Sequence, residues 1–182
     1  MLGQEATEAK SNEINAIPLL LERLNLTGAH ATIDAMGTQT KIAAAIRARG
    51  ADDLLALKDN RKSLADEVAL YFGSPEQQAI APHETIDADH GRLETRHHRV
   101  SHDVAWLNGD RRAPGEPRCP GLKAIAMVGA IPERDGKVMM ARRFFLSSRP
   151  LDARPLARTD RAHRGIENRL RLRCSTSSSR MT

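Results

Sequence analysis

The first part of the chain alternates between short helix-like and strand-like segments, and this alternation constrains the fold most strongly. Apolar residues recur at helical spacing near residues 17–25, 42–49 and 60–73. Between them lie an alternating stretch at 30–35 and a short apolar run at 54–57, which indicate two strands. Helices and strands that alternate through short connections predict an α/β layer with parallel strand pairs.

The pattern of helix-like and strand-like segments changes after Ser74. Residues 74–90 have the composition of a loop, and residues 92–101 alternate as a strand does. Two more strands are predicted at 123–128 and 137–146, on either side of a turn. We interpret this region as a β-rich insertion into the α/β core.

The last helix is expected from Pro150 to about Leu172, with an apolar face of irregular period. The tail beyond it is rich in serine and low in apolar residues, so it is expected to be disordered. The chain is therefore expected to divide into a partial core at 1–73, the β-rich insertion at 74–149, a C-terminal helix at 150–172 and a disordered tail at 173–182.

The charge of the chain favours a polyanionic partner. The formal net charge is +5 and the isoelectric point is about 9.7. From Arg142 onward there are many arginines, no lysine and three acidic residues, so the excess lies mostly in the last stretch. Basic residues that neutralise phosphates release counterions, which favours nucleic acid. A solvated basic surface accounts equally well for the charge alone.

The sequence also excludes some classes of protein. It contains no run of about 18 apolar residues, so no membrane-spanning helix is expected. The polar N-terminus lacks the apolar segment of a signal peptide. Cys119 and Cys174 are far apart and fit no metal-binding spacing. We therefore expect a cytoplasmic protein without a membrane partner.

Two acidic residues occupy positions at which carboxylates often carry chemistry. Asp34 follows a predicted strand, where α/β proteins place ligands, but its position alone favours a turn or helix-capping role. Glu167 lies on the predicted last helix between Arg164 and Arg171, which is also an ordinary ion-pair face. Position alone favours the structural interpretation for both residues and keeps the metal-ligand interpretation as the alternative.

Several strings in a fixed order shift this balance. They span roughly residues 2–170 and are SNEINAIP at 11–18, TIDAMGTQ at 32–39, LALKDN at 55–60, HGRLETR at 90–96, PGLKAI at 120–125 and GIEN at 165–168. Together they resemble the H-repeat-associated transposases, a branch of the DDE insertion-sequence transposases.

The resemblance implies an RNase H-like fold with three metal-binding carboxylates, namely two Asp and one Glu. Asp34, in the TIDAMGTQ string, corresponds to the second Asp, and Glu167, in the GIEN string, corresponds to the Glu. The implied chemistry is Mg²⁺-dependent DNA cleavage and strand transfer, in which two metal ions stabilise the attacking and leaving oxygens.

The sequence departs from the family pattern at both ends. The family's first catalytic Asp and its DNA-binding region precede the segment that begins here as Leu2-Gly3-Gln4, and after Leu170 the pattern gives way to an Arg- and Ser-rich tail. A frameshift is one hypothesis for that tail. We therefore expect a partial copy of the catalytic core that has no strand-transfer activity alone.

Six residues are candidates for contacts with DNA. Each has a structural alternative: a helix cap for Asn60, a polar strand face for the HGRLETR string and an exposed charged helix for the last segment. The candidates are Lys58, Asn60, His90, Arg92, Arg96 and Arg164.

Three functions remain open at this stage. The first is a fragment of a DDE transposase that acts on the ends of an insertion sequence and associates with the nucleoid. The second is a non-catalytic DNA-binding or dominant-negative protein that pairs with itself or with a full-length transposase. The third is a relic gene product without function.

Overall fold

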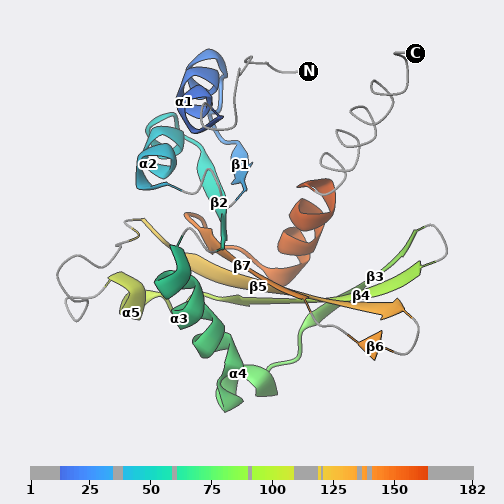
Figure 1. Ribbon diagram of the computed structural model, residues 1–182. Coiled ribbons are helices and arrows are strands. Elements are labelled where there is room, and N and C mark those ends of the chain that lie inside the picture. The colour runs from blue at the N-terminus through green and yellow to red at the C-terminus, as the bar shows by residue number, and fades with distance from the viewer. Residues whose placement is uncertain are drawn as a thin grey trace, which may run out of the picture.

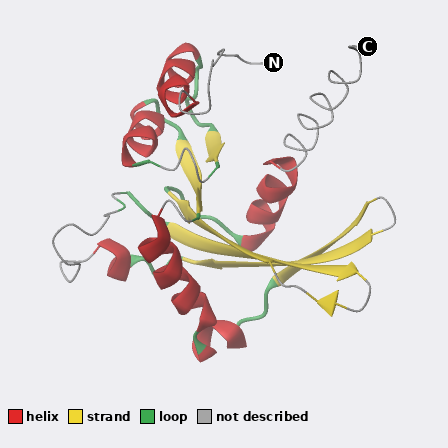
Figure 2. Ribbon diagram, viewed as in Figure 1, coloured by secondary structure: helices red, strands yellow, loops and turns green. Residues whose placement is uncertain are grey.

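The computed structural model describes residues 13–34, 39–58, 61–89, 92–108, 119, 121–134, 137–138 and 141–163. A single twisted sheet runs through the described part, with helices on both of its sides (Figure 1). The helix at 153–163 lies on the opposite side of the sheet from α3 (Figures 1 and 2). In the described part of the chain, no helix is both long and apolar enough to cross a membrane.

The predicted alternation in the first part of the chain is confirmed. The elements are α1 (Glu13–Arg23), β1 (His30–Ile33), α2 (Thr40–Ala48), β2 (Asp52–Leu57) and α3 (Lys62–Gly73). Strands β1 and β2 are parallel, and His30 pairs with Asp52 at the start of their register. The crossover through α2 permits this parallel pairing, as expected from the alternation of helices and strands.

The prediction of a loop at 74–90 is wrong. This segment forms α4 (Pro75–Ala79) and β3 (His83–Asp89). The Ser74 hydroxyl accepts a hydrogen bond from the Gln77 N–H, and Pro75 occupies the first turn, which is the usual start of a helix. Strand β3 pairs along its whole length with the next strand, β4 (Arg92–Ser101). Strand β3 was not predicted because its sequence is acidic and lacks a clear apolar alternation.

The remaining predicted strands are present, with a change in their extent. The elements are α5 (Ala105–Asn108), β5 (Ala124–Arg134), β6 (Lys137–Val138) and β7 (Ala141–Ser147), followed by the helix at 153–163. The part of the predicted last helix beyond residue 163, and the tail predicted to be disordered, lie outside the described residues.

Most of the sheet is antiparallel, which the sequence did not predict. The strand order is β1-β2-β7-β5-β4-β3, and β6 pairs with β5. Only β1 and β2 are parallel among the pairs of the described strands. Strand β7 pairs with β2 from Leu54↔Ser147 to Leu57↔Phe144. The segment interpreted as an insertion therefore continues the sheet of the first part.

The two faces of the sheet carry different cores because neighbouring side chains of a strand point to opposite faces. Leu55 and Leu57 of β2 pack on one face with α3, through Leu64, Val68 and Phe72. Leu54 packs on the other face with Leu156 of the helix at 153–163. A third cluster joins α1 and α2 and includes Leu21, Ile42 and Ile46.

Candidate functional site

A cleft of about 280 Å³ opens at the carboxyl ends of β1 and β2. Its walls are the ends of these two strands, the first half of β7 and the helix at 153–163. α/β proteins commonly bind ligands at the carboxyl ends of parallel strands. The charged or ionisable residues that border this cleft are Asp34, Lys58, Arg142, Arg143, Asp160 and His163.

Asp34 is an exposed residue of the cleft, one position beyond β1. Side chains alternate along a strand, so Asp34 shares a face with Thr32. Thr32 pairs with Leu54, which packs against Leu156 of the helix at 153–163. The local sequence therefore directs the Asp34 carboxylate to the side of the sheet that this helix covers.

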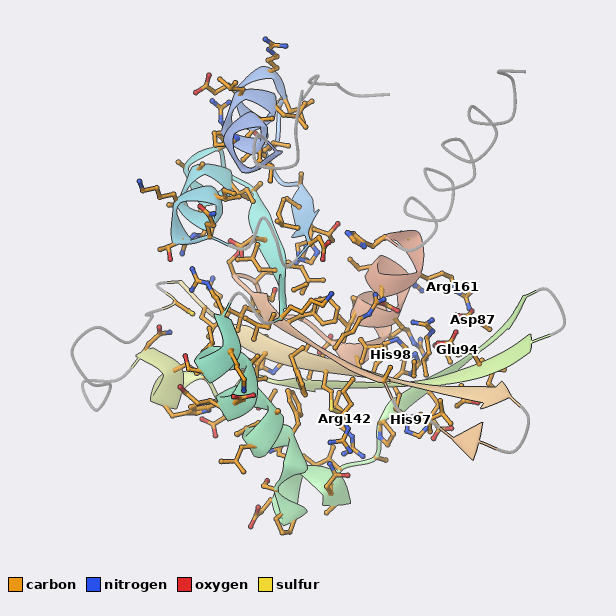
Figure 3. All side chains as sticks on the ribbon, in the orientation of Figure 1. Asp87, Glu94, His97, His98, Arg142 and Arg161 are labelled. Atoms are coloured by element: carbon orange, nitrogen blue, oxygen red, sulfur yellow. The ribbon has the colours of Figure 1, made fainter. Side chains whose placement is uncertain are left out.

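The difference in length between β2 and β7 brings basic residues to the cleft. The last pair between these strands is Leu57↔Phe144, and β7 extends beyond it along β5. Exposed Lys58 follows β2 directly, and exposed Arg143 pairs with Val128 on the helix-covered face. The side chain of Arg142 lies on the other face, beside His97 (Figure 3).

Arg96, predicted to contact DNA, has an internal role in the structure. Only 6% of the residue is exposed. Its guanidinium lies 2.6 Å from a Glu94 carboxylate oxygen, 3.1 Å from one of Asp160 and 3.6 Å from one of Asp87. Three carboxylates of the same chain thus surround its charge, which differs from the phosphate contact expected from the sequence.

Sequence reasoning missed this group of acids because β3 was not predicted. Asp87 of β3 lies directly opposite Glu94 of β4 in the register. Like charges at directly opposed positions are destabilising unless a cation lies nearby. If β3 had been predicted, the pairing of Asp87 with Glu94 would have required a nearby cation, and Arg96 would have been the candidate.

The other candidate residues have less complete descriptions. Asn60, His90, Arg164 and Glu167 lie outside the described residues. Arg92 is the first residue of β4, and only its backbone is described. Arg61, rather than Asn60, precedes α3 as its cap and makes no side-chain capping bond.

His98 is a buried imidazole two positions after Arg96 on the same strand, and sequence reasoning did not single out its burial. The residue is 1% exposed, and its Nδ1 lies 3.1 Å from the His83 carbonyl oxygen. Its Nε2 is buried without a hydrogen-bond partner. Burial lowers the pKa of His98, although the His83 carbonyl and Asp160 act in the opposite direction. The neutral form is therefore favoured around neutral pH.

The described residues contain no group of three or more His, Cys, Asp or Glu side chains arranged to hold a metal ion. Asp34 supplies one carboxylate at the open cleft. Its oxygens are the hard ligands that Mg²⁺ prefers. Asp160, the other acid of the cleft, accepts a hydrogen bond from Arg96. The described part of the site thus fits one expected metal ligand.

These features define a mixed α/β protein with an acid and several basic residues at the carboxyl ends of its parallel strands. Residues 1–179 match the Transposase DDE domain family, and the chain belongs to that family.

Curated relatives agree with this assignment and with the resemblance drawn from the strings. The putative transposase YncI of Escherichia coli O157:H7 is 37% identical over 175 residues, which are 93% of this chain and 44% of that protein. The H repeat-associated putative transposase YhhI of Escherichia coli (strain K12) is 35% identical over 182 residues, 95% of this chain and 46% of that protein.

A further relative has no activity in its name. An uncharacterized protein in the dhlA 3' region of Xanthobacter autotrophicus is 38% identical over 157 residues, which are 84% of this chain and 50% of that protein. The chain thus spans about half the length of the curated relatives it matches.

Proposed function

We propose that the cleft is part of the DNA-processing site of a DDE transposase. The position of Asp34 at the carboxyl end of a parallel strand pair, facing a cleft with basic walls, carries this proposal. Membership in the Transposase DDE domain family supports it. The parallel pair and the helix packed over it are also what an RNase H-like core would contribute, and we propose that fold for the complete protein.

We propose Mg²⁺ as the cofactor, with Asp34 and Glu167 among its ligands. Support for Asp34 comes from its exposure and its place in the cleft. Support for Glu167 comes from the GIEN string, in which it lies four positions after His163, the last described residue of the helix. In such sites two metal ions stabilise the attacking and leaving oxygens of a phosphodiester.

We propose that Lys58 and Arg143 contact DNA phosphates at the cleft. Both are exposed, and they lie next to each other in the sheet because Leu57 pairs with Phe144. Asn60, His90, Arg92 and Arg164 remain proposed DNA contacts on the strength of the sequence. The proposed partner is the end of an insertion sequence, which would place the protein at the nucleoid.

Salt-dependent DNA binding tests the basic wall of the cleft. Removal of one phosphate contact reduces the slope of log K against log salt by about 0.9. We expect Lys58→Gln and Arg143→Gln each to reduce the slope by about this amount, measured by fluorescence anisotropy with a labelled duplex.

Lys123→Gln is the matched control for these variants. Lys123 is an exposed cation next to Ala124, which pairs with Ser147 and so lies at the opposite end of the β2–β7 pair. Its slope should equal that of the unmodified chain. If the cleft variants and this control behave alike, DNA does not use the cleft.

A second candidate is a non-catalytic DNA-binding protein that pairs with itself or with a full-length transposase. The acids of the cleft favour this candidate, because metal-dependent cleavage needs several carboxylate ligands. Among the described residues, Asp34 is the one cleft acid that is not a partner of Arg96. Salt-sensitive DNA binding without metal-dependent cleavage would support this candidate. A protease-sensitive chain with a broad urea transition and no DNA binding would instead indicate a relic.

A further inference from the structure

An ionic cluster joins three elements that are distant in the sequence. It consists of Asp87 on β3, Glu94 and Arg96 on β4, and Asp160 and Arg161 on the helix at 153–163. Arg96 contacts all three acids, and Arg161 forms a second ion pair with Asp87. Figure 3 shows Asp87, Glu94 and Arg161 together where β3 and β4 pass this helix.

Two charged side chains of the cluster are buried, so their ion pair requires a defined geometry. The side chains of Arg96 and Asp160 are 7% and 3% exposed. Buried charges are costly unless their partners are well placed, so a displaced helix would separate buried Asp160 from the guanidinium of Arg96. The helix also makes apolar contacts through Leu156. Apolar contacts are non-directional and tolerate sliding, so the cluster is the contact that defines one position of the helix.

The same helix forms one wall of the cleft. Thr159, Asp160 and His163 border the cleft, and Asp160 is also the partner of Arg96. Asp34 lies on the opposite wall, at the end of β1. The position of the helix relative to the sheet therefore determines the width of the cleft between Asp34 and His163.

We infer that Asp87, Glu94, Arg96, Asp160 and Arg161 are positioning residues, which hold the helix at 153–163 so that the cleft accepts DNA. This inference rests on the proposed function of the cleft. The cluster lies beside the cleft and acts through the helix, whose sequence leads to Glu167 after a further four residues.

The sign of the effect of neutralising an acid tests the inference. Asp160→Asn and Asp87→Asn make the chain more positive, so a purely electrostatic effect would strengthen DNA binding. If these acids position the helix, both variants should weaken DNA binding, by at least about fivefold, the lower end of typical coupling between sites. Asn keeps the shape of Asp and an oxygen acceptor for Arg96, which limits the risk of unfolding.

Asp66→Asn is the matched control because it removes the same charge from an exposed pair, Lys62–Asp66, on α3. Binding of this variant should be unchanged or slightly stronger. DNA affinity of the full chain is measured by anisotropy at constant salt. Unchanged or stronger binding by Asp160→Asn and Asp87→Asn would overturn the inference.

Amide hydrogen exchange separates positioning from general destabilisation. In Asp160→Asn the amides of the helix at 153–163 should exchange about tenfold faster or more, while those of β5 and β7 keep their rates. Equal acceleration in the helix and in β5 would also overturn the inference. Failure of the proposed function has a different signature: Lys58→Gln and Arg143→Gln would match the Lys123→Gln control in the unmodified background.

Discussion

At the scale of single residues, His98 links folding stability to pH. Its pKa in the folded chain is lowered by burial below the ordinary value of 6.5, and that of His30 is lowered for the same first reason. The unfolded chain therefore binds more protons than the folded chain as the pH falls below about 6.5. The free energy of unfolding contributed by these groups is fully present at neutral pH and is lost through this window.

We expect His98→Gln to flatten the decrease in stability between pH 7.5 and pH 5 relative to the unmodified chain, because one titrating group is removed. The measurement is urea unfolding at several pH values in this range. His102→Gln, which changes an exposed histidine near β4, should keep the original slope. Identical slopes in all three proteins would show that His98 has the same pKa in the folded and the unfolded chain, which would contradict this prediction.

Asp34 and Arg96 illustrate which properties of a site residue can be predicted from its local sequence and which cannot. Asp34 could be assigned to the cleft because a strand end and its alternation are local features that the sequence displays. The carboxylate partners of Arg96 could not be predicted, because they include residues of β3 and of a helix 64 residues away in the sequence. A charge in a motif gives no sign of whether protein carboxylates or phosphates surround it.

At the scale of elements, α3 carries two of the five aromatic residues of the chain, and two others stack against them. Tyr71 and Phe72 lie on this helix, Trp106 stacks on Tyr71 with ring centroids 5.5 Å apart, and Phe144 of β7 stacks on Phe72 at 6.5 Å. Tyr71 also shares a 2.7 Å hydrogen bond with Ser101 at the end of β4. One helix thus joins β7, β4 and α5 on the same face of the sheet.

Phe72→Ala should therefore reduce the free energy of unfolding by about 3–5 kcal/mol, since Phe72 is only 1% exposed. Leu70→Ala is the control on the same helix, because Leu70 is 78% exposed and its replacement should change stability by no more than about 0.5 kcal/mol. Both values come from urea unfolding followed by circular dichroism. Similar losses in the two variants would contradict this packing.

The elements that the sequence predicted are those with a strong local period. The apolar spacing of α3 and the alternation of β4 can each be recognised within the short segment that forms the element. Strand β3 has an acidic sequence, HETIDAD, and is formed by pairing with β4 along seven positions. Such a strand depends on its neighbour, so its period alone does not reveal it.

At the scale of the whole molecule, the family could be inferred from strings but the topology of the sheet could not. The alternation predicted parallel pairs, and β1–β2 is one. The antiparallel pairing of β7 with β2 joins segments that no local pattern connects. It places Arg143 beside Lys58, so this part of the candidate site required the three-dimensional structure.

We expect the purified chain alone to show no strand transfer of insertion-sequence ends in Mg²⁺. The reason is the composition of the described part of the cleft, in which Asp34 is the one acid that does not pair with Arg96, whereas two metal ions need several carboxylate ligands. The measurement is a joining assay with labelled terminal-repeat DNA. Robust Mg²⁺-dependent joining that disappears in Asp34→Ala would refute this expectation.

The pairing of β2 with β7 also has a consequence for folding during synthesis on the ribosome, because the two strands are made at different times. Leu57 is translated long before its partner Phe144, and the intervening residues include β3, β4 and β5. Until β7 is made, β2 has an unpaired edge rich in leucine, which is a template for pairing with other nascent chains. Such long-range pairing slows folding and prolongs exposure to aggregation. Yield in cells should therefore depend on how quickly β7 follows and on the chaperones that cover β2 in the interval.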